Sequence, residues 1–157
     1  MIDKNGYRLN VGMILINNQN LVFWGKRKGE DSWQFPQGGL HENETIEDGM
    51  FRELKEELGL PKEHVQIIHH TQDWLYYDVP AIYNRPNNHG YKGQKQIWYL
   101  LLLTGKDHHI NVKSHVEQEF DAWRWIDYWT TAESVISFKR NVYQAALNEL
   151  SNYLPKI

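Results

Sequence analysis

The sequence predicts an α+β fold, an α/β/α sandwich in which helices pack against a mixed β-sheet. The first observation is the order of the segments, because several strand-like stretches surround two amphipathic helical stretches, residues 45–58 and 139–154. The second is composition: 157 residues with 41% hydrophobic and 24% charged side chains suit one compact core. We therefore expect a single domain over residues 1–157.

The N-terminal segment is predicted to be a β-hairpin followed by a loop. Two apolar runs, VGMILI and LVFWGK, lie on either side of the asparagine-rich sequence NNQN, which favours a turn. Residues 38–44 begin with two glycines and are expected to form a glycine-rich loop. That loop leads into the first helix.

Residues 45–58 are predicted to form an amphipathic helix with well-marked ends. Thr45 and Asp48 fit a capping box at its start, and Gly59 with Pro61 marks its end. Apolar residues recur at every fourth position: Ile46, Met50, Leu54 and Leu58. This stripe should pack the helix against the sheet.

The second half of the chain is predicted to complete the sheet and add the remaining helices. Strands are expected at residues 65–71, 74–78, 94–103 and 120–126, which are rich in β-branched and aromatic residues. The Pro/Asn/Gly-rich residues 80–93 indicate a surface loop. Thr130 with Glu133 could cap a short helix, and residues 139–154 carry the apolar stripe of a final helix.

Charge and hydropathy exclude some classes of function. A net charge of −3 argues against a surface that grips nucleic acid over a wide area, so a polyanionic substrate needs a local basic patch or a bound metal. The longest apolar run, residues 97–103, is too short to cross a bilayer, and the N-terminus lacks the apolar core of a secretory signal. We expect a cytoplasmic protein without membrane contact.

Three carboxylates, Glu53, Glu56 and Glu57, share one face near the end of the first predicted helix. The helix dipole disfavours negative charge there by about 0.3–1 kcal/mol per group. A divalent cation would supply the missing positive charge, and Gly49, one turn earlier, would leave room for a ligand. Because the sequence has no cysteine, metal ligands must be oxygen or imidazole groups, which favours Mg²⁺ or Mn²⁺.

A solvent-exposed charged face is the alternative, with Arg52 and Glu56 as a simple i,i+4 pair. The wider spacing argues against it. Gly38, five residues, Glu44, seven residues and the run RELKEELGL (52–60) together fill the pattern Gx5Ex7REUxEExGU, where U is aliphatic. Chance would produce this match about once in 10⁷ or more chains of this length. The sequence therefore resembles the Nudix hydrolases, whose signature this pattern is.

This resemblance implies the Nudix fold with a loop–helix–loop metal site, and hydrolysis of a nucleoside diphosphate linked to another group. It implies that Glu53, Glu56 and Glu57 bind the metal, and that Glu44 and Arg52 pair to brace the loop against the helix. Bound Mg²⁺, or Mn²⁺ in its place, would neutralise phosphate oxygens and activate a water. Either Glu53 or Glu56 could take the proton from that water.

Segments outside this pattern resemble the bacterial RNA pyrophosphohydrolases of the same family, which convert a 5′-triphosphate RNA end to a monophosphate and so promote mRNA decay from that end. They are GYRLNVG (6–12), WQFPQGG (33–39), GQKQIWYLL (93–101), EFDAWRW (119–125) and SFKRNVY (137–143). Leu9 and Ala122 depart from the resemblance, since we expect Pro and Gly there. The resemblance implies 5′-triphosphorylated RNA as substrate, and Glu119 and the Gly38 carbonyl as additional metal ligands. Taken alone, Glu119 would be read as a surface acid.

Seven further residues are candidates for holding the polyphosphate and the RNA end. Cationic side chains suit phosphate oxygens, and Arg or Phe can stack on a base. The candidates are Arg8, Arg27, Gln94, Lys95, Gln96, Phe138 and Lys139. Strand alternation puts Lys95 on the opposite face from Gln94 and Gln96, so a joint role requires a bend. Ordinary surface polarity, or a core position for Phe138, is the alternative.

Two other functions stay open on the sequence. Plant-type diadenosine tetraphosphate hydrolases carry similar segments, so a dinucleoside polyphosphate is the second candidate substrate. A catalytically silent binding module is the third hypothesis, although simple binding would not require every acid of the pattern to be present.

Overall fold

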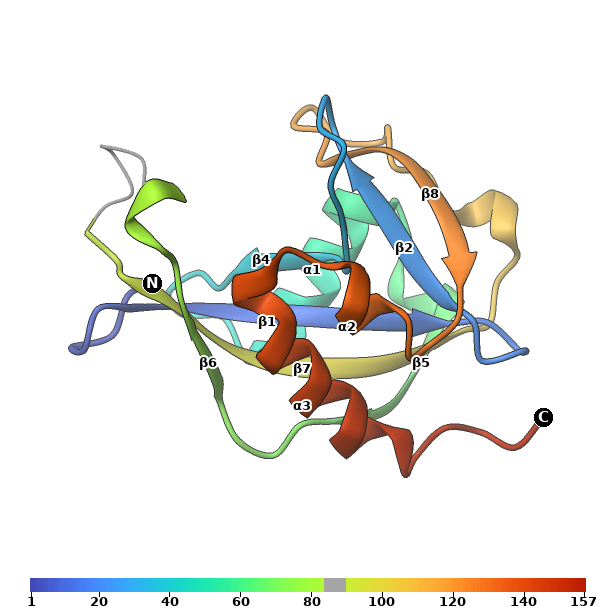
Figure 1. The fold of residues 1–157 in the computed structure, drawn as a ribbon. Coiled ribbons are helices and arrows are strands. Elements are labelled where there is room, and N and C mark those ends of the chain that lie inside the picture. Colours follow the sequence, from blue (N-terminus) through green and yellow to red (C-terminus); the bar gives the residue numbers. More distant parts are fainter. Residues whose placement is uncertain (84–89) are drawn as a thin grey trace.

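The centre of the sheet is the parallel pair β1 (Tyr7–Ile16) and β7 (Gly93–Leu103), which are in register along the whole of β1. The protein is described by a computed structural model covering residues 1–83 and 90–157 (Figure 1). The other strands are β2 (Val22–Arg27), β3 (Trp33–Gln34), β4 (Gln37–Gly39), β5 (Val65–His70), β6 (Leu75–Asp78) and β8 (Phe120–Ile126). The α-helices are α1 (Ile46–Leu58), α2 (Thr131–Ser134) and α3 (Arg140–Ser151).

The sheet is mixed, as the sequence predicts. Its main strand order is β3-β2-β1-β7-β5, while β4 pairs with β1, β6 with β7 and β8 with β2. Every strand pair except β1 with β7 is antiparallel. Figure 1 shows α1 on one side of the β1 and β7 strands and α2 with α3 on the other. The predicted α+β sandwich is therefore confirmed.

From Val11 to Ile16, strand β1 has no polar side chain, because both of its faces are buried there. Val11, Met13 and Leu15 belong to the core cluster beneath α1. Ile14 and Ile16 point the other way, into the cluster beneath α3. Burial on two sides fixes the register of the central strands and so fixes which β1 side chains reach each face.

The boundaries of α1 follow its local signals closely. The Thr45 side chain accepts a hydrogen bond from the Asp48 N–H at 3.0 Å, and Gly59 ends the helix with a left-handed φ of 67°. The final helix is shorter than predicted, since residues 137–139 form a separate 3₁₀ turn and α3 ends at Ser151. The Thr130 side chain makes no capping bond at α2.

Two predicted features of the N-terminal half need correction. The predicted hairpin is present, since β1 and β2 pair antiparallel around a turn at residues 17–20, but it is short. Ile16 pairs with Val22, and β2 then pairs with β3 and β8. Gly38 and Gly39 belong to strand β4, hydrogen-bonded to β1, so the loop before α1 starts at Leu40. Both departures come from pairing between distant segments, which a local turn signal does not report.

Part of the predicted loop at residues 80–93 lies outside the described residues, which omit 84–89. On the described part, residues 81–83 form a 3₁₀ turn and Gly93 already belongs to β7. Over residues 1–83 and 90–157, no helix combines the length and the apolarity needed to span a bilayer.

Candidate active site

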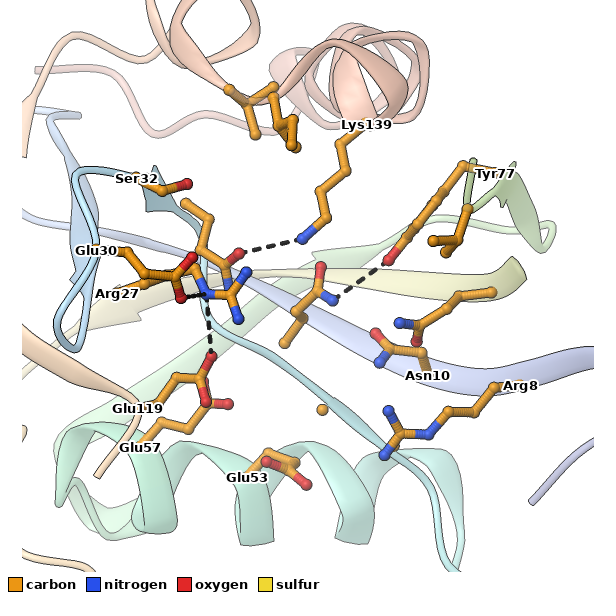
Figure 2. Close-up of a pocket in the computed structure, with 18 of the residues that line it drawn as sticks. Arg8, Asn10, Arg27, Glu30, Ser32, Glu53, Glu57, Tyr77, Glu119 and Lys139 are labelled. Carbon is orange, nitrogen blue, oxygen red and sulfur yellow. Dashed lines mark hydrogen bonds and ion pairs between the residues drawn. The ribbon is translucent and has the colours of Figure 1, made fainter. Parts of the chain in front are cut away.

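The buried face of α1 carries two of the three predicted acids into the molecule. Glu53 and Glu57 are only 8% and 7% exposed, whereas the Glu56 side chain is 34% exposed. Figure 2 shows Glu53 and Glu57 rising from α1 toward a cleft. The apolar side chains Met50, Leu54 and Leu58 anchor the helix to the sheet, so the acids stand on a rigid element.

Arg52 supplies positive charge to this acidic group. Its Nη1 donates to Glu53 Oε1 at 2.8 Å and to Glu56 Oε2 at 3.3 Å. Its Nε and Nη2 donate to the two oxygens of Glu44 at 3.1 and 2.8 Å, and Nη2 also donates to the Gly39 carbonyl at 2.8 Å. The bidentate pair with Glu44 ties the loop to the helix, and it lowers the pKa of Glu44 to about 2.

The two glycines beside the acids serve close packing. A Cβ built on Gly38 would lie 1.9 Å from the Glu53 carboxyl carbon, so only glycine lets β4 pass this side chain. The predicted open space at Gly49 is wrong, because a Cβ there would meet Leu40 at 2.4 Å and Glu44 at 2.9 Å. Because Gly49 has no side chain, Leu40 and Glu44 of the loop can pack against α1 at this point. The part of α1 that faces the cleft therefore begins at Glu53.

Burial disfavours the ionised form of both inward-facing acids. Desolvation raises the pKa of Glu53, opposed by the hydrogen bond and charge of Arg52. Desolvation raises the pKa of Glu57 well above its ordinary value, and the negative charges of Glu53 and Glu119 add to this effect. Glu57 Oε2 is buried without a hydrogen-bond partner among the described residues. An ionised Glu57 calls for a cation beside it.

The donor set fits a hard divalent cation, although it is not assembled around one. Among residues 1–83 and 90–157, no three acidic or histidine side chains lie together closely enough to hold a metal as they stand. Helical spacing predicts that the three acids converge, but Arg52 holds Glu53 and Glu56 through its own hydrogen bonds. Carboxylate oxygens, one of them an unpartnered buried atom on Glu57, are the ligands that Mg²⁺ and Mn²⁺ prefer.

The acids face a cleft of about 950 Å³ whose opposite wall is basic and polar. Arg8, Arg27, Lys139 and Glu119 line it (Figure 2). Phe138 lines it as well. Arg27 Nε lies 3.3 Å from Glu30 Oε2 and 4.0 Å from Glu119 Oε1. The cleft thus opposes positive side chains to the carboxylates of α1.

Lys139 is a buried cation on this basic wall. It is 7% exposed, and its Nζ donates to Gln34 Oε1 at 3.1 Å. Desolvation lowers the pKa of Lys139 to about 8, with the positive charge of Arg27 adding to the effect. An anion bound in the cleft would favour its charged form.

Four of the predicted residues do not line the cleft. Glu44 and Arg52 lie behind the acids, where they brace the loop. Gln96 is fully buried beneath the cleft floor, while its neighbour Gln94 reaches the cleft. Lys95 takes the opposite face because β7 alternates regularly, and its Nζ lies 3.1 Å from Asp3 Oδ2. The strand has no bend that would bring all three together.

Several residues that line the cleft were not among the predicted site residues. Among those that line it are Asn10, Gln34, Gln37, Tyr77 and Tyr91. Asn10 is a buried polar residue directly before the apolar run of β1, which is a usable signal for a site. Gln34 and Gln37 lie within the WQFPQGG segment singled out above. Tyr77 and Tyr91 are ordinary strand and loop aromatics in sequence, and only the fold reveals their place.

Comparison with known proteins gives the fold and the family. A model of the NUDIX domain matches residues 6–146. The dihydroneopterin triphosphate pyrophosphohydrolase of E. coli has a TM-score of 0.68 at 21% identity, covering 90% of this chain and 98% of that one. An Ap4A hydrolase of C. elegans, in a binary complex, has a TM-score of 0.66 at 16% identity, covering 93% and 99%.

A third similar structure contains a metal ion. It is a bifunctional NMN adenylyltransferase/ADP ribose pyrophosphatase from Francisella tularensis, complexed with AMP and a manganese ion, with a TM-score of 0.62 at 18% identity, covering 93% of this chain and 41% of that one. At these identities the three structures establish the fold alone. The domain match spans nearly the whole chain, and the protein is therefore a member of the Nudix hydrolase family, whose enzymes typically use a divalent metal to hydrolyse phosphoanhydride bonds.

Proposed function

We propose that this enzyme is an RNA 5′-pyrophosphohydrolase, which releases pyrophosphate from 5′-triphosphorylated RNA, leaves a 5′-monophosphate and so promotes RNA decay from that end. One observation carries the proposal. The five segments that resemble RNA pyrophosphohydrolases are scattered along the sequence, yet each contributes to the same cleft. They supply Arg8, Gln37, Gln94, Glu119 and Lys139 respectively.

The charges in the cleft suit a triphosphate. Arg8, Arg27 and Lys139 offer cationic donors to phosphate oxygens on one wall. On the other wall, Glu53, Glu56 and Glu57, with Glu119 and the Gly38 carbonyl, are the proposed ligands of Mg²⁺ or Mn²⁺. A cleft with cationic side chains on one wall and metal ligands on the other suits a phosphoanhydride. Its oxygens need positive partners, and the metal ions that neutralise them need carboxylate ligands.

The cleft also has surfaces for a base. Phe138 lies against Tyr77, with ring centroids 5.8 Å apart, and both side chains line the cleft near Lys139. Single-stranded RNA is commonly held by stacking on aromatic rings or on arginine. A volume of about 950 Å³ has room for a triphosphate and at least one nucleotide. Phe138 and Arg27 are the proposed base contacts.

In the proposed reaction, water attacks a phosphorus of the triphosphate, the bond between that phosphorus and the bridging oxygen breaks, and pyrophosphate departs. When bound, the divalent cation supplies neutralisation of the phosphate oxygens and acidifies the attacking water. Glu53 or Glu56 accepts the proton from that water. Arg52 keeps these two carboxylates in place, while Arg8, Arg27 and Lys139 hold the polyphosphate.

A dinucleoside polyphosphate hydrolase is the second candidate, because apolar side chains enter the cleft from two separate parts of the chain. Trp33, Val135 and Ile136 line it from β3 and the end of α2, and Val79, Ile82 and Tyr91 line it from the segments around β6 and β7. Two adenosines could use two such surfaces. The Ap4A hydrolase of C. elegans shares this fold.

The deciding experiment compares kcat/KM for 5′-triphosphorylated RNA and for diadenosine tetraphosphate, each with Mg²⁺ and with EDTA. We expect RNA to be preferred, pyrophosphate to be released, and turnover to vanish in EDTA and return with Mg²⁺. A much higher kcat/KM for the dinucleotide would replace the RNA assignment with the second candidate. If neither substrate turns over with Mg²⁺ or Mn²⁺, both assignments are wrong.

A further inference from the structure

A chain of buried side chains connects the core to the floor of the cleft. The Trp98 indole Nε1 donates to Gln96 Oε1 at 3.1 Å. Gln96 Nε2 then donates to Asn10 Oδ1 at 2.8 Å and to Gln37 Oε1 at 3.1 Å. Gln96 lies opposite Asn10 in the parallel β1 and β7 register, which puts both amides on one face of the sheet.

This chain fixes which end of each amide is which. An amide alone can be turned over without a change of shape, but an indole N–H can only donate. Trp98 therefore makes the nearer Gln96 atom an oxygen, and the Gln96 NH₂ in turn makes the nearer Asn10 atom an oxygen. Asn10 must present its NH₂ group away from Gln96.

The Asn10 NH₂ group has no hydrogen-bond partner among the described residues, although Asn10 lines the cleft and is only 1% exposed. A buried donor without an acceptor is costly, so native structures rarely keep one without a use. The other unpartnered amide atom on this floor is Gln94 Oε1, and no hydrogen bond joins the two. The free donor points to an acceptor that arrives with a ligand.

The surroundings of Asn10 select a phosphoryl oxygen as that acceptor. Arg8 lies two residues earlier on the same face of β1, and so adds a cation to the donor. Gly39 pairs with Asn10 across β4, next to Gly38, which packs against Glu53. Asn10 thus lies between the basic wall and the proposed metal ligands, where a polyphosphate would run.

We propose that Asn10 binds the substrate by donating its amide N–H to a non-bridging oxygen of the polyphosphate, with Gln96 and Trp98 as positioning residues. The inference rests on the proposed function only in requiring a polyphosphate in this cleft. It holds for triphosphorylated RNA and for diadenosine tetraphosphate alike. Its test therefore uses whichever of the two the wild-type enzyme hydrolyses faster.

The test pairs Asn10→Ala with substrates in which one non-bridging oxygen at a time is replaced by sulfur, a poor hydrogen-bond acceptor, as separate diastereomers. On the all-oxygen substrate we expect kcat/KM to fall about 10- to 100-fold, the range for loss of a donor to a charged oxygen. On one sulfur analogue the penalty of Asn10→Ala should shrink below about threefold, because the lost bond is already absent. Any effect of sulfur on the metal is common to both enzymes and cancels.

Asn10→Asp serves as the second variant, since it keeps the shape and still accepts from Gln96 while presenting an oxygen to the cleft. It should lose at least as much activity as Asn10→Ala. Because burial disfavours a carboxylate at this 1% exposed position, it should also melt below wild type, so both variants are assayed well below their melting temperatures. Asn141→Ala, on the exposed face of α3, is the matched control and should behave as wild type. The proposal is overturned if both Asn10 variants stay within threefold of wild type. It is also overturned if the penalty is equal on every sulfur analogue.

Discussion

The three main acids of one cleft wall lie within residues 53–57 of a single helix, whereas the opposite wall collects side chains from strands and turns far apart in the sequence. Glu53, Glu56 and Glu57 on α1 are placed by helical spacing and by one cap at each end. Arg8 on the basic wall and Asn10 on the cleft floor depend instead on how β1, β4 and β7 pair. A wall built within one helix keeps its acids together, which suits the metal chemistry of the Nudix family. A wall assembled from separate segments can be changed one residue at a time, which suits the recognition of a particular substrate.

The acidic wall should be the more sensitive of the two. We predict that Glu53→Gln and Glu57→Gln each lower kcat at least about 100-fold, as for other metal-site and acid/base residues. Measured in EDTA near neutral pH, Glu57→Gln should melt at or above the wild-type temperature, because burial disfavours the charge that it removes. Steady-state kinetics and thermal unfolding check both statements.

Glu47→Gln is the matched control for the acids, since Glu47 lies exposed in the first turn of the same helix. It should retain wild-type kinetics. Near-normal turnover in both the Glu53 and the Glu57 variants would remove the site assignment, whatever the control does.

Within the acidic wall, Arg52 should affect activity by holding the carboxylates of Glu53 and Glu56 in place. Arg52→Lys keeps one charge but cannot reproduce contacts to Glu44, Glu53 and the Gly39 carbonyl together, so we expect activity to fall about 10- to 100-fold. The loss should shrink at high Mg²⁺ if misplaced ligands are the cause. Activity independent of Mg²⁺ concentration would contradict that explanation.

The same ion pair gives a stability signature in acid. In the folded protein the hydrogen bonds from Arg52 lower the pKa of Glu44 to about 2, from its ordinary value of 4.5. Its contribution is therefore present above pH 4.5 and is lost as the pH falls toward 2. Glu44→Gln should be less stable than wild type at pH 7 and should show a shallower loss of stability across that window. Parallel acid curves for the two proteins would contradict the assignment.

The difference between the walls also explains how much could be foreseen from sequence. Thr45 and Gly59 gave the ends of α1 because caps act within a few residues. Gly38 was expected in a loop, since its pairing with Val11 depends on a contact 27 positions away in the chain. Asn10 needed the register of two strands and the indole of Trp98 before its role could be inferred.

Lys139 tests the basic wall, where we expect a smaller effect than on α1. Lys139→Met should raise KM about tenfold at pH 7 with little change in kcat, by removing one charged donor to the polyphosphate. The KM of the wild-type enzyme should rise as the pH passes about 8, because Lys139 then loses its proton. The variant should lack that step, and a wild-type KM that is flat from pH 7 to 9 would contradict the prediction.

Lys139 should also leave a stability signature, at alkaline pH and with the same sign of slope as that of Glu44, because the folded pKa is lowered in both cases. Burial lowers its pKa in the folded protein to about 8, from the ordinary value of 10.5. Between these pH values the unfolded chain therefore holds a proton that the folded chain has released. Wild-type stability should therefore gain from Lys139 as the pH rises from 8 to 10.5. Chemical denaturation of wild type and Lys139→Met across this range measures the difference.

Lys95 should give the smallest effect and mark the edge of the site. It neighbours Gln94 and Gln96 in sequence, but its Nζ pairs with Asp3 and lies 4.9 Å from the Trp74 ring centroid, on the α1 side of the sheet. Lys95→Ala should therefore keep kcat/KM within about twofold of wild type, the usual range for a side chain that touches no substrate. It should slightly lower the melting temperature, because the N-terminal segment loses a contact. A tenfold loss of activity at an unchanged melting temperature would show that substrate reaches both faces of β7. The cleft described above would then not be the whole binding site.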